Sequence, residues 1–178
     1  MENIEKIILL KPLFSKAELE MLKNLRNSPK KAHLIINKVK ENSIEDIKQW
    51  LKTKNKEPKV QGVFMVYFDN KKNKSPIGYV SYFIENNYNK VAKLGICLTK
   101  NSQGQGFGRI SIKLLLDKLK TNLNIKHFSY SSLSSNKPSI NLFNSLGFKE
   151  TNILENNFYS FGKWHDVVEG ELVINSEI

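Results

Sequence analysis

The chain has 178 residues, of which 40% are hydrophobic, so it is long enough for one domain with a substantial core. It has one cysteine, Cys97, and no apolar run near the roughly 20 residues of a membrane-spanning helix. We therefore expect no internal disulfide, no membrane partner and a cytoplasmic location. The formal net charge of +11 attracts anions, but it comes from lysines dispersed among asparagines, so nucleic acid is not an expected partner.

The first third of the chain predicts one strand followed by two amphipathic helices. Residues 4–10 are typical of a strand. Ser15 with Glu18 three residues later forms a capping-box pattern and predicts a helix that ends near residues 27–29. Ser43 is the expected cap of a second helix, whose apolar face carries Ile44, Ile47, Trp50 and Leu51.

The rest of the chain predicts strands and helices in mixed order. Strands are expected over 63–68, 77–84 and 90–98, then a helix to about 123, a strand over 126–133, a short helix after Pro138, a strand from Phe148 and a last strand over 164–174. This order predicts a mixed, largely antiparallel α/β sheet of six or seven strands with helices on both faces. Since no repeat or long linker interrupts it, we expect residues 1–178 to form a single domain.

The most informative segment is the turn Gln103-Gly104-Gln105-Gly106-Phe107-Gly108, between an apolar strand and an amphipathic helix. Glycines let the backbone approach a ligand closely, and the first amides of the helix point outward unpaired. That arrangement suits a pyrophosphate group. The turn lacks a Gly-Lys-Ser/Thr ending, and residues 120–130 offer no carboxylate, which disfavours a nucleoside triphosphatase and a dinucleotide-binding fold.

At this point the chain resembles the GNAT superfamily of N-acetyltransferases. The cofactor signature of that superfamily, Arg/Gln-x-x-Gly-x-Gly/Ala, matches Gln103, Gly106 and Gly108. Its later signature matches Asn136, Ser139, Leu142-Phe143 and Gly147-Phe148, about 30 residues on. The resemblance implies the GNAT fold with a splayed central strand pair, a coenzyme-binding core over about residues 90–150, and acetyl-CoA as co-substrate.

The resemblance also implies roles for single residues. The backbone of Ile96, Cys97 and Leu98 would hold the pantetheine and the thioester carbonyl. The amides of Gln103, Gly104, Gln105, Gly106, Phe107 and Gly108 would bind the pyrophosphate, while Asn136 and Phe143 would face the cofactor. Two plainer interpretations stay open: Cys97 as a small buried filler and Asn136 as a helix cap.

The expected catalytic groups are less well defined by the sequence. Phe143 stands where the family usually has a tyrosine that protonates the leaving thiolate, and Lys93 stands where many relatives have a glutamate base. Candidates for the acid are Tyr130, Ser145 and Tyr159, or the thiolate leaves without direct protonation. Candidates for the base are Glu85 and His165, or proton removal runs through ordered water.

Both ends of the chain bear on the acceptor. The segment from Phe161 to Val168 resembles two small-molecule branches, which act on phosphinothricin-like amino acids and on nucleotide-linked amino sugars of the pseudaminic type. Arg26 and Trp50 resemble positions of the second branch, so Arg26, Trp50 and Trp164 are the expected substrate residues. Plainer interpretations stay open: Arg26 as the closing residue of a helix, and the two tryptophans as core or pocket wall. Cationic polyamines call for an acidic pocket, for which the sequence offers little.

The expected function is acetyl transfer from acetyl-CoA to a primary amine of a small molecule, with an amino-sugar nucleotide as the acceptor. The alternatives are N-terminal acetylation of a ribosomal or other protein and a non-catalytic acyl-CoA-binding module. No metal is expected, because His33, His127 and His165 are scattered and no Cys/His spacing matches a metal site. The C-terminal strands could support a homodimer.

Overall fold

The computed structural model describes residues 6–28, 41–70, 73–85, 90–160 and 162–174. Its elements are β1 (Lys6–Leu10), α1 (Lys16–Asn27), α3 (Ile44–Lys54), β2 (Gln61–Asp69), β3 (Lys74–Glu85), β4 (Val91–Leu98), the 3-10 helix η1 (Lys100–Ser102), α4 (Phe107–Leu123), β5 (His127–Leu133), α5 (Lys137–Ser145), β6 (Lys149–Ser160) and β7 (Lys163–Val173). The predicted order of strands and helices is confirmed, with η1 as an addition. Residues 4 and 5 of the expected first strand, 4–10, lie outside the described residues.

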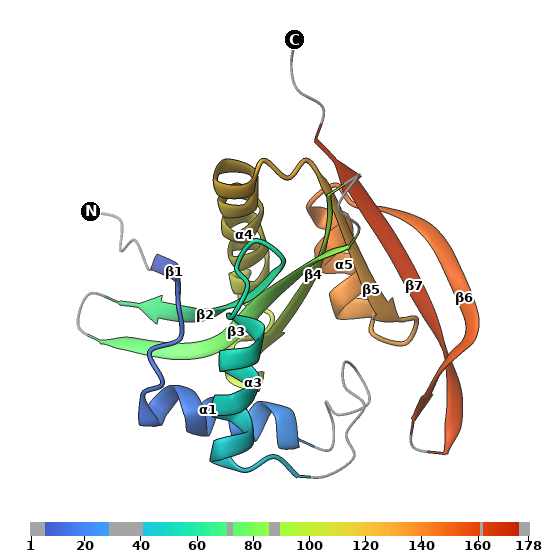
Figure 1. Cartoon of the computed structure of the whole chain (residues 1–178). Helices are drawn as coiled ribbons and strands as arrows, with labels where there is room; N and C mark the ends of the chain where they lie inside the picture. The colour runs from blue at the N-terminus through green and yellow to red at the C-terminus, as the bar shows by residue number, and fades with distance from the viewer. Residues whose placement is uncertain (1–5, 29–40, 71–72, 86–89, 161, 175–178) are drawn as a thin grey trace.

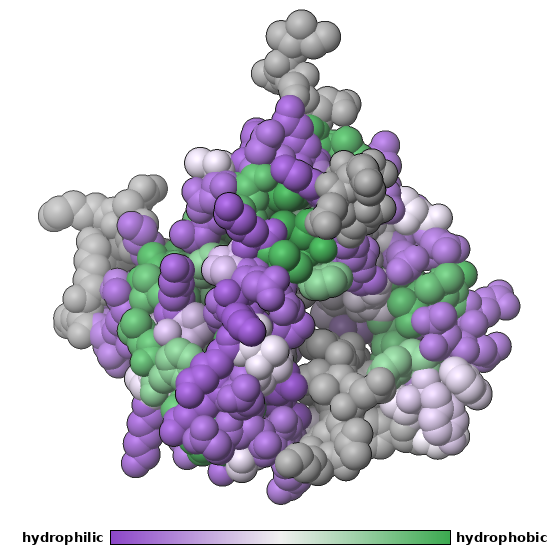
Figure 2. Space-filling view, in the orientation of Figure 1, coloured by the Kyte–Doolittle hydropathy of each residue, from purple (hydrophilic) through white to green (hydrophobic). Residues whose placement is uncertain are grey.

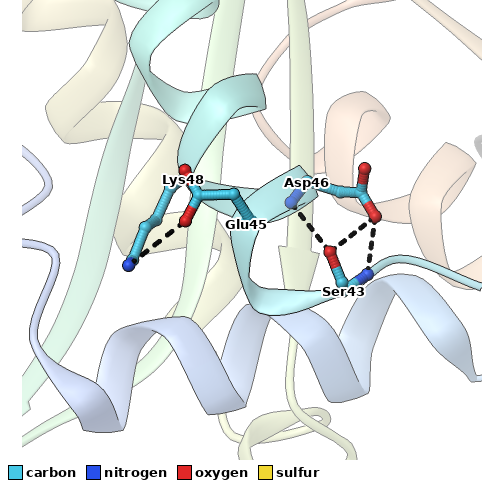
Figure 3. A network of polar contacts seen from close by, with 4 residues as sticks. All are labelled: Ser43, Glu45, Asp46 and Lys48. Carbon is cyan, nitrogen blue, oxygen red and sulfur yellow. Dashed lines mark hydrogen bonds and ion pairs between the residues drawn. The ribbon is translucent and has the colours of Figure 1, made fainter.

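The first two helices begin where their capping residues predict. The Ser15 hydroxyl accepts a hydrogen bond from the amide of Glu18, whose buried carboxylate accepts from the amides of Leu13 and Ser15 and from the Tyr67 hydroxyl. At the start of α3, the Ser43 hydroxyl likewise accepts a hydrogen bond from the amide of Asp46, and the Asp46 carboxylate accepts one from the amide of Ser43 (Figure 3). These reciprocal bonds satisfy amides that a helix start leaves unpaired. The capping of α1 also ties the helix to the sheet through Tyr67.

The seven strands of the described residues form one sheet in the order β1-β2-β3-β4-β5-β7-β6. Neighbouring strands are antiparallel except β4 and β5, which run parallel and pair only through Val91–His127, Ala92–Phe128 and Lys93–Ser129. Beyond those three residue pairs the two strands part (Figure 1). The expected fold, with its splayed strand pair in a largely antiparallel sheet, is confirmed.

Helices cover both faces of the sheet and define two cores (Figure 1). Along β4, Leu94 and Leu98 belong to the core beneath α4 and α5, whereas Cys97 belongs to the core beneath α1 and α3. Because side chains of a strand alternate between faces, Lys93 lies on the same face as Cys97. The visible surface is mainly hydrophilic, with hydrophobic residues showing in separate patches, one of them over the β6–β7 side of the sheet (Figure 2). Within the described part of the chain, no helix is long and apolar enough to cross a membrane.

Candidate functional site

A cavity of about 730 Å³ lies where β4 and β5 part. Its walls come from β4, the glycine turn, the start of α4, the end of β5 and α5, with single residues from β6 and β7. The volume is within the range of small-molecule sites, about 300–1,000 Å³. The splay therefore opens the middle of the sheet to a ligand.

The glycine turn forms the polar end of this cavity. Gly104 and Gly106 have φ values of +73° and +79°, which L side chains rarely adopt, and a Cβ on either would meet nothing within 4 Å. Gly106 is the N-cap of α4 and provides no side-chain cap, so the N-terminal amides of α4 and its dipole face outward. Lys100 and Arg109 line the cavity at the same end. This end suits an anionic group, such as a pyrophosphate.

The residues predicted to bind the cofactor converge on the cavity with two exceptions. Its lining includes Ile96, Cys97, Leu98, Gln103, Gly104, Gly106, Gly108, Asn136 and Phe143. Gln105 instead donates from its side chain to the carbonyl of Asn101, and Phe107 packs on Phe68 with ring centroids 5.3 Å apart. For these two residues, therefore, only the backbone is left to contact a ligand at the turn.

Two predicted residues also have a local structural role. Gln103 donates a hydrogen bond of 3.0 Å from Nε2 to the carbonyl of Leu98, which ties the turn to the end of β4. Asn136 caps α5 by accepting from the amide of Ser139 at 3.4 Å, and it lines the cavity as well. The two interpretations of Asn136, helix cap and cavity wall, are compatible.

The sequence analysis missed several lining residues. Lys100 and Arg109 flank the predicted turn, and Ser131, Ser132 and Leu133 form the β5 wall. Phe158 and Val167 approach from β6 and β7. The cations could have been proposed because they adjoin the turn. The serines could not, because their position depends on which strand pairs with β4.

Phe143 lines the cavity with its ring stacked against Tyr130, at a centroid distance of 4.3 Å and an interplanar angle of 4°. Tyr130 is fully buried, and burial, with a smaller contribution from Glu150, raises the pKa of its hydroxyl above the usual 10.0. Its Oη has no hydrogen-bond partner among the residues that the structure describes. The side chain of Ser145, another candidate acid, donates to the carbonyl of Leu142 at 2.7 Å.

The other candidate catalytic residues lie outside the cavity lining. Tyr159 is 55% exposed and packs edge-on against Trp164, which is 58% exposed. These two residues are cross-strand partners, and so are the neighbouring Phe158 and His165. Since Phe158 lines the cavity, alternation puts His165 on the cavity side of the hairpin and Tyr159 and Trp164 on the other. The Nε2 atom of His165 lies 3.3 Å from the carbonyl oxygen of Ser160.

Glu85 belongs to a network of charges on the α1/α3 face of the sheet. Its carboxylate lies 3.5 Å from the Nζ atom of Lys93, and Glu169 of β7 lies 3.8 Å from the same atom. Glu169 also accepts a 3.1 Å hydrogen bond from the Ser131 hydroxyl. Nearby, His127 contacts Glu171 at 3.0 Å. Strands far apart in sequence thus bring Glu85, Glu169 and Glu171 to this face, but none of the three lines the cavity.

The predicted substrate residues separate into two places. The Arg26 guanidinium lies over the Trp50 ring, 4.3 Å from its centroid, and Trp50 packs edge-on against Tyr79 at 5.4 Å. Tyr79 is the cross-strand partner of the cavity residue Cys97. Burial raises the pKa of Tyr79, Cys97 adds to that effect, and the Arg26 guanidinium opposes it. Trp164 lies apart from this cluster, beside Tyr159 on the β6–β7 hairpin.

Arg26 has an unused donor in this cluster. Its Nε atom is buried and lacks a hydrogen-bond partner within the described ranges. Ser28, two residues further along the chain, lines the cavity. The same ranges contain no group of three or more His, Cys, Asp or Glu side chains that could hold a metal ion.

Comparison with known proteins agrees with this geometry. Residues 8–149 match the family described as the acetyltransferase (GNAT) domain. A curated relative from Bacillus licheniformis, the uncharacterized N-acetyltransferase p20, is 31% identical over 91 residues, which are 51% of each chain. The match thus spans about half the length of that relative.

Two solved structures share the fold along nearly their whole length. The spermidine N-acetyltransferase of Vibrio cholerae, in complex with CoA and spermine, superposes with a TM-score of 0.80 and 22% identity, covering 97% of this chain and 96% of its own. The ribosomal-protein-S5-alanine acetyltransferase of Vibrio fischeri superposes with a TM-score of 0.81 and 22% identity, covering 99% of this chain and 96% of its own. With the family match over residues 8–149, these findings show that the chain belongs to the GNAT acetyltransferase family.

Proposed function

We propose that this protein transfers the acetyl group of acetyl-CoA to a primary amine. The observation that carries the proposal is the cavity between β4 and β5, which has a glycine turn and a helix N-terminus at one end. A nucleotide-linked thioester has the matching shape, with charged phosphates at one end and a slender arm at the other. Bound acetyl-CoA supplies the activated acetyl group.

The lining residues fit the two parts of such a molecule. The amides of the turn, together with Lys100 and Arg109, would hold the phosphates. Ile96, Leu142 and Phe143 provide an apolar passage for the pantetheine arm between β4 and α5. Holding the thioester and the amine in one cleft is itself a large part of catalysis for a reaction of two substrates.

For the acceptor we propose a small molecule with an amino group and an anionic group, of which an amino-sugar nucleotide is the expected example. Arg26 supports this choice, because a buried Nε–H without a partner suits a phosphate oxygen. Trp50 and Tyr79 hold the guanidinium near Cys97 and the cavity. Trp164 lies on the side of the β6–β7 hairpin away from the cavity residue Phe158, so its role as a substrate residue stays a prediction without further support. Glu85, Tyr159 and His165 stay predictions as catalytic residues, as does the homodimer.

The test is release of CoA thiol from acetyl-CoA in the presence of a panel of amines. The panel contains an amino-sugar nucleotide, phosphinothricin, spermidine and a short peptide with the N-terminal sequence of a ribosomal protein. Fastest turnover of the amino-sugar nucleotide supports the full proposal. Preference for the peptide would favour N-terminal acetylation. Preference for spermidine would indicate that the glutamates near Lys93 bind a polyamine. Acetyl-CoA binding without any turnover would favour the non-catalytic module.

A further inference from the structure

Three side chains form a polar network at the end of the cavity where β4 and β5 begin to part. Lys93 belongs to the last residue pair between these strands, and Ser131 of β5 lines the cavity just beyond it. Glu169 of β7 is the cross-strand partner of Ser131 and accepts a hydrogen bond of 3.1 Å from its hydroxyl group. The network therefore joins a cavity wall to a carboxylate that the catalytic candidates from the sequence did not include.

The network lies on a part of the sheet that leaves its side chains open to water. The sheet residues buried in the core beneath α1 and α3 come from β2, β3 and β4, and no described residue of this core comes from β5 or β7. The side chains of Lys93 and Glu169 are 36% and 34% exposed. A carboxylate in this position can accept a proton from the cavity through Ser131 and release it to solvent.

We propose that Ser131 and Glu169 together remove the proton that an acceptor ammonium must lose before it can attack. The inference rests on the proposed acetyl transfer and names the proton acceptor for it. An amine with a pKa near 10 is almost wholly protonated at neutral pH and has no free electron pair. Ser131 would contact the amine, and Glu169 acts through Ser131 as a positioning residue and proton acceptor.

The proton transfer balances as follows for a primary ammonium. One N–H bond breaks, its electron pair stays on nitrogen, and the proton passes to Oγ of Ser131. The former hydroxyl proton of Ser131 passes to Oε1 of Glu169, which becomes a neutral acid and later loses the proton to water. The neutral amine then forms the new N–C bond, the C–S bond breaks, and a second amine proton goes to the departing thiolate. The products are an amide and CoA thiol.

The geometry favours Glu169 over Glu85 for this role. Both carboxylates contact Lys93, but Glu85 belongs to β3, on the side of β4 away from the splay, and lies outside the cavity lining. Glu169 alone of the two bonds to a lining residue. The Lys93 ammonium, 3.8 Å from Glu169, holds that carboxylate at the edge of the cavity.

Other charged groups face the same region, so the experiment needs a control for a change of charge there. They are Glu85 on β3, Lys93 on β4, His127 on β5, Glu171 on β7 and Lys149, the β6 partner of Glu171. Glu171 is the matched control, because it lies on the same strand and face as Glu169 and contacts His127 instead of Ser131. A change of charge on this face alone would affect Glu169→Gln and Glu171→Gln alike.

The experiment measures kcat/KM for the best acceptor between pH 7 and 9.5 in the wild type, Glu169→Gln, Ser131→Ala and Glu171→Gln. At pH 7 we expect Glu169→Gln and Ser131→Ala to lose about 10²-fold, a usual size for general-base catalysis, and Glu171→Gln to stay near the wild type. The deficit of Glu169→Gln should shrink as pH approaches the pKa of the amine, because solution then supplies neutral amine. A purely structural defect would be the same at every pH.

The outcomes separate this inference from the proposed function. Turnover by the wild type with equal losses in Glu169→Gln and Glu171→Gln overturns the inference and leaves acetyl transfer in place. A deficit of Glu169→Gln that does not change with pH also overturns it. Absence of turnover in the wild type on every amine overturns both, and acetyl-CoA affinity, measured by calorimetry on the same samples, shows whether the cavity still binds the cofactor.

Discussion

The rings of Tyr130 and Phe143 lie parallel, 4.3 Å apart, where β5 meets α5. The outer ring, Phe143, lines the cavity at the position where the family usually has a tyrosine, and the inner ring carries the hydroxyl. That hydroxyl is buried without a partner among the described residues. The pair therefore presents an apolar wall to the ligand and keeps its one phenol group in the core.

We expect Tyr130→Phe to stabilise the fold and leave catalysis unchanged. A buried polar group without a hydrogen bond costs about 1–3 kcal/mol, and this substitution removes it with little change of shape. Urea denaturation should show a free energy of unfolding higher by about 1 kcal/mol, with kcat equal to that of the wild type. A large fall in kcat would instead make Tyr130 the acid that protonates the thiolate. Ser145→Ala is a second test of that role.

We expect Gly106→Val to weaken acetyl-CoA binding by tenfold or more, and Gly162→Val to leave it unchanged. Both glycines have positive φ, +79° and +76°, and a Cβ at either would meet nothing within 4 Å. The backbone strain of the two substitutions is therefore matched, but only Gly106 lines the cavity. Calorimetric titration with CoA measures the difference. Equal affinities in the two variants would contradict the placement of the phosphates at this turn.

We expect Tyr67 to make the fold sensitive to alkali. Burial, followed by the hydrogen bond and charge of Glu18, raises the pKa of Tyr67 from 10.0 to about 12. Between these values the unfolded chain loses the proton and the folded chain retains it, so stability is full below pH 10 and falls as pH rises towards 12. The slope contributed by one such group is at most tenfold in the unfolding constant per pH unit.

Tyr67→Phe isolates this effect from the titration of lysines. The variant should be less stable than the wild type at pH 7, since Glu18 loses a hydrogen bond that it accepts in a buried site. The difference between the two proteins should narrow between pH 10 and 11.5 in urea denaturation. A constant difference over that range would show that Tyr67 has an ordinary pKa in the folded state.

We expect Arg26→Gln to raise the KM for a phosphate-bearing acceptor by about tenfold to a hundredfold, the value of one or two charge-assisted hydrogen bonds. The KM for acetyl-CoA should stay unchanged, because Arg26 lies outside the cavity lining. Lys52→Gln, an exposed charge on α3, is the control for net charge. If both variants raise the KM equally, long-range attraction explains the effect and Arg26 does not contact the acceptor.

Local patterns predicted the elements and the glycine end of the site. Ser15 and Ser43 mark helix starts by side-chain chemistry within four residues, and that chemistry does not depend on the rest of the fold. The turn from Gln103 to Gly108 is equally local, since the positive φ values of Gly104 and Gly106 favour glycine. The later motif, which begins at Asn136, predicted Asn136 and Phe143 as cofactor residues, and both line the same cavity as the turn.

The remaining part of the site depends on strand pairing, which a single sequence does not reveal. β7 inserts between β5 and β6, so Glu169 comes beside Ser131 although 38 residues separate them. The same pairing brings Glu169 to Lys93, in addition to Glu85 of the neighbouring strand β3. Trp164 shows the converse case: its motif matched a substrate position, but strand alternation turns it to the side of the hairpin away from Phe158.

Among the described residues, three residue pairs between β4 and β5 are the strand pairing that joins one half of the sheet, β1 to β4, to the other half, β5 to β7. A ligand in the cavity contacts both halves at once, so its binding free energy is added to the free energy that holds them together. At a concentration a hundred times its Kd, that contribution is about 2.7 kcal/mol. The thermal stability of this protein should therefore follow the supply of its own cofactor.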